Sequence, residues 1–93
     1  MPKFEWDERK NLANKNKHGF SFESGKSVFN DNNRVEIEDK RADYGERRWL
    51  TIGKVLNVIL TVVYTLRDTT IRIISARRAS KKERAKYNEN QPS

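Results

Sequence analysis

Apolar residues are concentrated in the second half of the chain, where they repeat with the two-residue period of β-strands. Val35 and Ile37 alternate with glutamates, which predicts a strand with one face in water. The stretch from Val55 to Leu66 is largely apolar on both faces and rich in β-branched residues, which indicates a central strand. Short connections, the first at Gly53-Lys54, predict an antiparallel meander for the last three strands. Four strands are predicted, at residues 34–39, 47–52, 55–66 and 70–76.

Polar capping residues mark the ends of three predicted helices. Asp7, Ser21 and Ser80 are candidate N-caps, Glu83 completes a capping box with Ser80, and Gly19 is a candidate stop. The helices are predicted at residues 8–18, 22–29 and 81–89. We therefore expect an α+β fold in one domain, residues 1–93, with two N-terminal helices, a four-stranded antiparallel sheet and a C-terminal helix.

The charge balance favours a polyanionic partner. The chain carries 20 basic and 13 acidic residues, a net charge of +7, and residues 69–93 hold seven basic against two acidic side chains. Such a surface attracts nucleic acid, and it can equally attract an acidic protein. An apolar signal region is missing at the N-terminus, and the apolar run ending at Leu66 is too short for a membrane helix. A cytoplasmic protein without membrane contact is expected.

Composition also narrows the chemistry. The chain has no cysteine, which excludes disulfides, thiolate catalysis and cysteine-based zinc sites. His18 is the single histidine, and neither a metal-ligand pattern nor a phosphate-binding glycine loop accompanies it. We therefore expect a protein without metal or other cofactor.

Arginines at the end of the last predicted strand are candidate phosphate ligands. In a regular strand, Ile71, Ile73 and Ser75 point to one side of the sheet, and Arg72, Ile74 and Ala76 point to the other. The two residues after Ala76 then leave the end of the strand towards opposite sides. Guanidinium groups fixed in this way can bind phosphate oxygens, or they can bind an acidic partner. The two arginines in question are Arg77 and Arg78.

RNA cleavage suits such a surface because the 2′-hydroxyl of RNA is itself the nucleophile. The protein must move protons and stabilise the charge of the transition state. His18, Glu46 and Tyr64 are candidate proton carriers, and Trp49 can stack on a base. Each has a simpler interpretation: Trp49 and Tyr64 as core residues, Glu46 as an ion-pair partner of a nearby arginine, and His18 as a helix C-terminal residue.

Several motifs, in order along most of the chain, make it resemble the BrnT family of bacterial toxins. They include Phe4-Glu5-Trp6-Asp7, Lys17-His18-Gly19, Glu46-Arg47-Arg48-Trp49, Val62-Val63-Tyr64-Thr65 and Arg72-Ile73-Ile74-Ser75-Ala76-Arg77-Arg78-Ala79. The resemblance implies a fold similar to RelE-like ribonuclease toxins and toxicity through RNA cleavage that blocks translation. It also implies a BrnA-like antitoxin, a heterotetramer built on an antitoxin dimer, and operator DNA bound only through that antitoxin.

Together these observations predict a metal-independent endoribonuclease toxin. Proton transfer is assigned to His18 and Glu46, and phosphate binding to Arg67, Arg77 and Arg78. Contacts with RNA are assigned to Trp49, Tyr64 and Arg72. The alternatives are a non-enzymatic basic module that binds an acidic protein and, with less support, a DNA-binding regulator.

Overall fold

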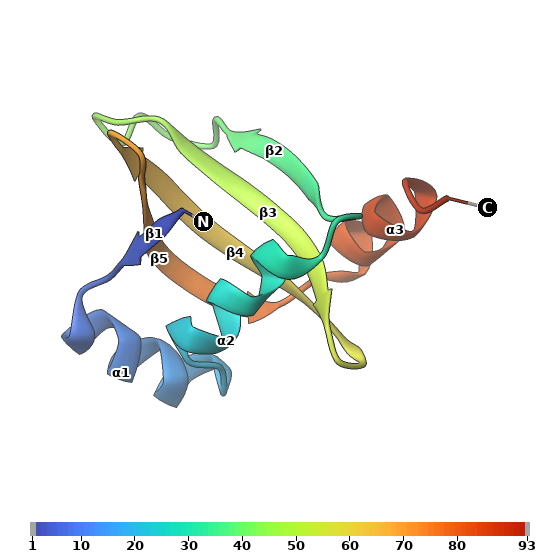
Figure 1. Cartoon of the computed structure of the whole chain (residues 1–93), viewed down its shortest axis with the longest axis horizontal. Coiled ribbons are helices and arrows are strands. Elements are labelled where there is room, and N and C mark those ends of the chain that lie inside the picture. The colour runs from blue at the N-terminus through green and yellow to red at the C-terminus, as the bar shows by residue number, and fades with distance from the viewer. Residues whose placement is uncertain (1, 93) are drawn as a thin grey trace.

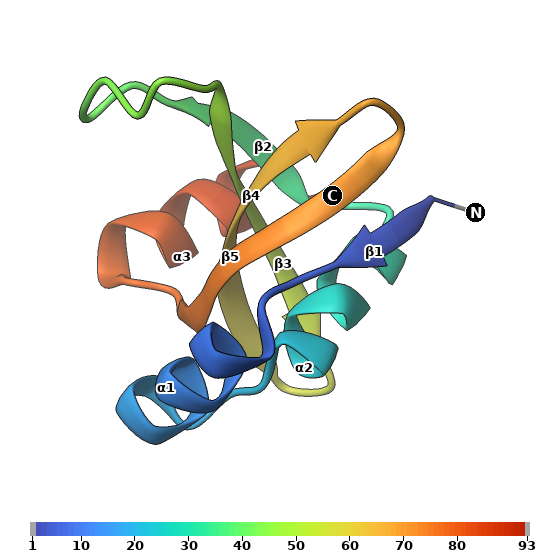
Figure 2. The same ribbon diagram turned by 90° about the vertical axis from the view of Figure 1, so that its left-hand side faces the viewer.

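A mixed five-stranded sheet with helices on both faces forms the structure (Figure 1). This computed structural model describes residues 2–92. The strands lie in the order β1-β5-β4-β3-β2, and Figure 2 shows α2 and α3 on opposite sides of the sheet. The elements in chain order are β1 (Lys3–Glu5), α1 (Glu8–His18), α2 (Phe22–Ser27), the 3-10 helix η1 (Val28–Asn30), β2 (Val35–Asp39), β3 (Arg48–Val55), β4 (Val58–Arg67), β5 (Thr70–Arg78) and α3 (Lys81–Glu89).

The α+β class is confirmed, but the prediction of a four-stranded antiparallel sheet is wrong. A fifth strand, β1, pairs in parallel with β5, and Phe4 lies opposite Ile71. Three residues are too few to show a two-residue period, and their partner lies at the other end of the chain. The two-residue period that predicted the other strands therefore could not predict β1.

The predicted turn at Gly53-Lys54 is also wrong. Strand β3 continues through these residues to Val55, and the turn follows at Leu56, which has a positive φ of 54°. Gly53 is required for a different reason. A Cβ atom on Gly53 would lie 2.7 Å from a methyl carbon of Val28, so its missing side chain lets η1 pack directly on β3.

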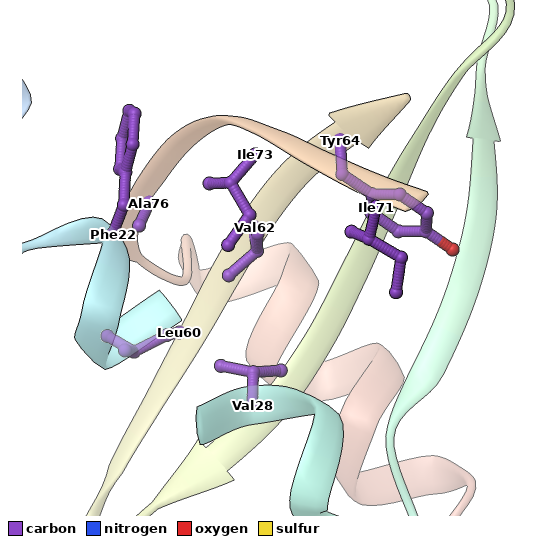
Figure 3. Packing of buried hydrophobic residues seen from close by; sticks show 8 residues of the cluster. All are labelled: Phe22, Val28, Leu60, Val62, Tyr64, Ile71, Ile73 and Ala76. Atoms are coloured by element: carbon purple, nitrogen blue, oxygen red, sulfur yellow. The ribbon is translucent and has the colours of Figure 1, made fainter. Parts of the chain in front are cut away.

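Each face of the sheet has its own apolar core. We call the face that carries Leu60 and Val62 the α2 face, and the face that carries Thr61 and Val63 the α3 face. The smaller core, on the α3 face, joins Ile52 and Tyr87. The larger core, on the α2 face, contains Phe22, Val28, Leu60, Val62, Tyr64, Ile71, Ile73 and Ala76 (Figure 3).

A β-bulge interrupts the regular alternation of β5. Tyr64 of β4 lies opposite Ile73, whereas the preceding residue, Val63, lies opposite Ser75, so Ile74 is an extra residue. The expectation that Ile71, Ile73 and Ser75 share a face is therefore wrong. Ala76 joins the isoleucines in the core of the α2 face, and Ser75 lies on the α3 face.

Asn14 of α1 holds the bulged part of β5. Its side chain is buried, with 7% exposed, and its Oδ1 accepts from the backbone N–H of Ala76 at 3.2 Å. Its Nδ2 donates to the carbonyl oxygens of Ala76 at 2.7 Å and of Phe20 at 2.8 Å. The amide of Asn14 thus replaces the neighbouring strand that this stretch of β5 lacks.

Candidate nucleic-acid interface

Three arginines of β4 and β5 lie on the α3 face. Arg72 lies opposite Thr65 and Arg77 opposite Thr61, which are alternate residues of β4, and Arg67 follows two residues after Thr65. Residues five apart in a regular strand point to opposite faces, so the bulge at Ile74 is what brings Arg72 and Arg77 to the same one. They are separated by about 15 Å along the strand.

Arg77 is fixed by a carboxylate of α3. Its two terminal nitrogens donate to Glu83 at 2.7 and 2.9 Å in a fork geometry, and Thr61 donates to the same carboxylate at 3.0 Å. Burial alone would raise the pKa of Glu83, but the hydrogen bonds from Arg77, the Ser80 N–H and Thr61 lower it to about 2. Glu83 therefore links the start of α3 to the end of β5.

This pair leads to a pH-dependent stability. The folded-state pKa of Glu83, about 2, lies below its ordinary value of 4.5, so the pair contributes fully above pH 4.5 and its contribution is lost as the pH falls towards 2. Glu83→Gln should lower the free energy of unfolding by about 2 kcal/mol at neutral pH. In urea unfolding across this range, the difference from the wild type should shrink at low pH.

A matched control is Glu46→Gln. Glu46 is 3.3 Å from Arg48 in an ion pair at the surface, so its loss should cost less than about 1 kcal/mol at every pH. If Glu83→Gln were equally destabilising at pH 7 and pH 3, the contribution of Glu83 would not be ionic.

The other two arginines of this face differ in their pairing. Arg72 forms an ion pair with Glu5 of β1, and both side chains remain partly exposed. Arg67 has no carboxylate within ion-pair distance among residues 2–92, and it lies exposed at the end of β4. Arg67 is thus open to an incoming anion, whereas Arg72 is oriented by Glu5.

His18 lies in a shallow groove between α1 and the bulge of β5. The groove has a volume of about 250 Å3 and is lined on the helix side by Lys10, Lys17 and His18. Its strand side is formed by Ile74 and Ser75, which lie between Arg72 and Arg77 in the chain. A histidine and two lysines therefore border the α3 face where Ser75 emerges.

Other predicted site residues lie elsewhere. Arg78 lies on the α2 face, so Arg77 and Arg78 do point to opposite sides, although both belong to β5 rather than following it. Trp49 and Tyr64 are also on the α2 face, where their rings stack with centroids 5.9 Å apart. Burial, followed by the charge of Glu36, raises the pKa of the Tyr64 hydroxyl, so the hydroxyl stays protonated and is a weak acid, which makes it a poor proton carrier.

Glu46 and His18 are not brought together. Glu46 precedes β3 at the end of the sheet near Arg67, whereas His18 lies against the middle of β5. The site residues predicted from the sequence therefore lie on both faces of the sheet and at different positions along its strands.

Sequence patterns missed the lysines of the groove and the role of Asn14. The helix α1 has few apolar residues, so its periodicity did not show which side packs on β5. Residue type did not single out Asn14 either, because α1 contains three asparagines, Asn11, Asn14 and Asn16.

Two general searches complete the description of residues 2–92. They contain no group of three or more His, Asp or Glu side chains placed to hold a metal ion. Within the same residues, no helix has the length and apolar character needed to cross a membrane.

Comparison with known families gives one match. A family model described as the ribonuclease toxin BrnT of a type II toxin-antitoxin system matches residues 6–83. The matched region contains His18, the bulge at Ile74 and the arginines Arg67, Arg72 and Arg77. A search of curated proteins found no match.

Proposed function

The chain belongs to the BrnT family of ribonuclease toxins of type II toxin-antitoxin systems, and from this premise we propose that it cleaves RNA on the α3 face of its sheet. The supporting observation is the bulge at Ile74. It gives Arg72 and Arg77 a common face and opens that face next to the groove of His18. Bulges are frequent beside active sites because they redirect side chains.

The proposed binding mode follows the charges of this face. Arg67, Arg72 and Arg77, with two lysines of the groove, attract the phosphates of a single RNA strand. Arg72 and Arg77 are held by carboxylates and keep a fixed orientation, so they suit a phosphate whose charge increases during the reaction. Arg67 and the lysines supply attraction along the strand.

In the proposed mechanism, the 2′-hydroxyl of the RNA attacks the neighbouring phosphorus and the 5′-oxygen leaves. This produces a 2′,3′-cyclic phosphate and a free 5′-hydroxyl, and no nucleophile from the protein is needed. The 2′-hydroxyl loses one proton and the departing 5′-oxygen gains one. We assign one of these two transfers to the imidazole of His18, a general acid–base group, and the other to water. The arginines stabilise the additional negative charge on the phosphate oxygens.

The mechanism predicts that cleavage proceeds without a divalent metal ion. Purified toxin should cleave single-stranded RNA equally well with and without EDTA, because the arginines supply the positive charge. Products should end in a 2′,3′-cyclic phosphate, and a substrate with a single 2′-deoxy nucleotide should resist cleavage at that position. Gel analysis and mass spectrometry of the fragments measure these outcomes.

Two results would contradict the proposal. Loss of cleavage in EDTA, restored by Mg²⁺, would replace the proposed mechanism with metal catalysis. Binding of RNA without any cleavage, on free RNA or on translating ribosomes, would favour the non-enzymatic basic module.

The cellular role follows from the same premise. We propose that RNA cleavage blocks translation in the cytoplasm, and that a BrnA-like antitoxin neutralises the toxin in a heterotetramer built on an antitoxin dimer. Type II antitoxins are proteins, so the family implies a protein partner as well as the RNA substrate. In this proposal operator DNA is bound through the antitoxin.

A further inference from the structure

Four aromatic side chains form a continuous row on the α2 face. Phe4 contacts Phe29 edge-on with centroids 5.2 Å apart, and Phe29 contacts Tyr64 in the same way at 5.2 Å. Tyr64 then stacks on Trp49. The row crosses from β1 over η1 to β4 and β3, and Figure 1 shows α2 in front of the sheet with β1 to its left. We call these four side chains the aromatic row.

A cation lies over three of the four rings. Lys26 lies 5.7 Å from the centroid of Phe4, Arg34 5.5 Å from that of Phe29, and Arg47 5.2 Å from that of Trp49. Every one of these cations also has its own carboxylate. The ion pairs are Lys26–Glu23 at 3.6 Å, Arg34–Glu36 at 3.5 Å and Arg47–Glu38 at 3.1 Å.

The aromatic row is therefore surrounded by balanced charge. An RNA strand needs a surface with excess positive charge because each phosphate is an anion. On the α3 face, Arg72 and Arg77 have carboxylate partners, but Arg67 and the groove lysines Lys10 and Lys17 form no ion pair among residues 2–92 and supply this excess. An apolar centre with aromatic and arginine side chains and a polar rim is typical of protein–protein contacts. The charges around the aromatic row thus favour a protein over RNA.

Two features offer anchoring points for such a protein. A cavity of about 290 Å3 lies beside the two touching rings of Phe4 and Phe29, with Pro2 and Lys26 among its lining residues. Leu66 is 47% exposed and lies on the same face, opposite Ile71, which in turn lies opposite Phe4. A leucine exposed beside an aromatic cavity is a suitable contact for an apolar side chain of a partner.

We propose that the partly exposed rings of the aromatic row (Phe4, Phe29 and Trp49), the cavity beside Phe4 and the side chain of Leu66 form the docking site of the antitoxin, while the buried Tyr64 supports the row from the core. The occupant is an amphipathic segment that inserts an apolar side chain into the cavity beside Phe4 and Phe29 and places charges of both signs on the rim. This inference rests on the antitoxin partner of the proposed function and not on RNA cleavage. It separates the two partners, with RNA on the α3 face and the antitoxin anchored on the α2 face.

The test compares two leucine substitutions of the toxin. Leu66→Glu places a charge in the proposed contact, and Leu12→Glu makes the same change at a leucine of α1 that is 57% exposed and outside it. The binding probe is the purified protein encoded by the reading frame adjacent to the toxin gene. Its affinity for each variant is measured by calorimetry, and urea unfolding confirms that both variants are folded.

Leu66→Glu should weaken antitoxin binding by on the order of thirtyfold, as expected for a central contact of an interface, while Leu12→Glu leaves it unchanged. Both variants should cleave RNA at the wild-type rate. If the wild type does not cleave RNA, the proposed function fails, but the comparison of antitoxin affinities still decides this inference.

Three outcomes would overturn the inference. Unchanged antitoxin affinity of Leu66→Glu would place the antitoxin elsewhere on the toxin. A loss of binding to uncleavable 2′-O-methyl RNA, with antitoxin binding intact, would make the aromatic row a base-stacking platform. A dimer of the toxin alone that Leu66→Glu dissociates would assign the surface to a second copy of the chain.

Discussion

Arg72→Ala is expected to lower the rate of RNA cleavage by on the order of a hundredfold to a thousandfold, the loss measured when a preorganised donor to a transition-state oxyanion is removed. Arg72 lies on the α3 face beside the groove of His18, and Glu5 holds its guanidinium in place. Because the contact strengthens as charge develops on the phosphate, the loss should appear in kcat more than in KM. Single-turnover cleavage of a labelled RNA measures it.

Arg78→Ala is the matched control for this prediction. Arg78 is exposed and, among residues 2–92, has no carboxylate within ion-pair distance, but it lies on the α2 face. Its removal takes away the same charge from the same strand, and cleavage should stay within about threefold of the wild type, the change expected from weaker long-range attraction.

Folding should not complicate the comparison. The pair of Arg72 with Glu5 is partly exposed, so its loss should cost less than about 1 kcal/mol of stability. A folded Arg72→Ala toxin with wild-type kcat would exclude Arg72 from the reaction. Equal losses in the Arg72 and Arg78 variants would mean that the protein attracts RNA only through its total charge.

Local signals in the sequence were sufficient for α1 and α3, whereas the helix predicted at residues 22–29 ends at Ser27 and continues as the 3-10 helix η1. Asp7 caps α1 as predicted, Gly19 ends it with a positive φ of 81°, and Ser80 forms the expected capping box with Glu83. These features depend on residues no more than four positions apart, so they can be recognised without knowledge of the fold. The order of the last three strands followed in the same way from their short connections.

Features that depend on distant partners could not be predicted. Strand β1 exists because Phe4 pairs beside Ile71, and the residues after the bulge at Ile74 are hydrogen-bonded by the amide of Asn14 in another element. Neither partner can be identified from a pattern along the chain. The bulge also reverses which side each following residue faces, so the alternation of β5 misplaced Ser75 and Ala76.

The candidate site shows the same division. That Arg77 and Arg78 point to opposite sides follows from strand geometry and was predictable. That Arg77 is bound by Glu83, whereas Trp49 lies on the face away from it, depends on the packing of α3 and on the register of β3. The sequence therefore indicated arginines as candidate phosphate ligands, but it did not show which of them lie on the same face of the sheet.

Asn14→Leu is expected to have the largest effect on stability and to reduce cleavage as well. The substitution keeps a side chain of similar size but removes three hydrogen bonds, two to Ala76 and one to Phe20. Buried backbone groups that lose their partners each cost about 1–3 kcal/mol, so we expect a loss of about 4 kcal/mol in the free energy of unfolding. Urea unfolding at neutral pH measures this loss.

The effect on cleavage should exceed the effect of unfolding alone. The bulge gives Arg72 and Arg77 their common face, and Asn14 is the side chain that holds the bulge. The comparison is made at a temperature where circular dichroism shows that the Asn14→Leu variant is folded. There the variant should still cleave RNA at least about tenfold more slowly than the wild type, because a shift of one arginine already misplaces its contact with the phosphate. Asn16→Leu, the same change at an exposed position of α1, should alter neither stability nor cleavage. A folded Asn14→Leu toxin with full activity would mean that the bulge forms without Asn14, since the common face of the two arginines would then have survived its loss.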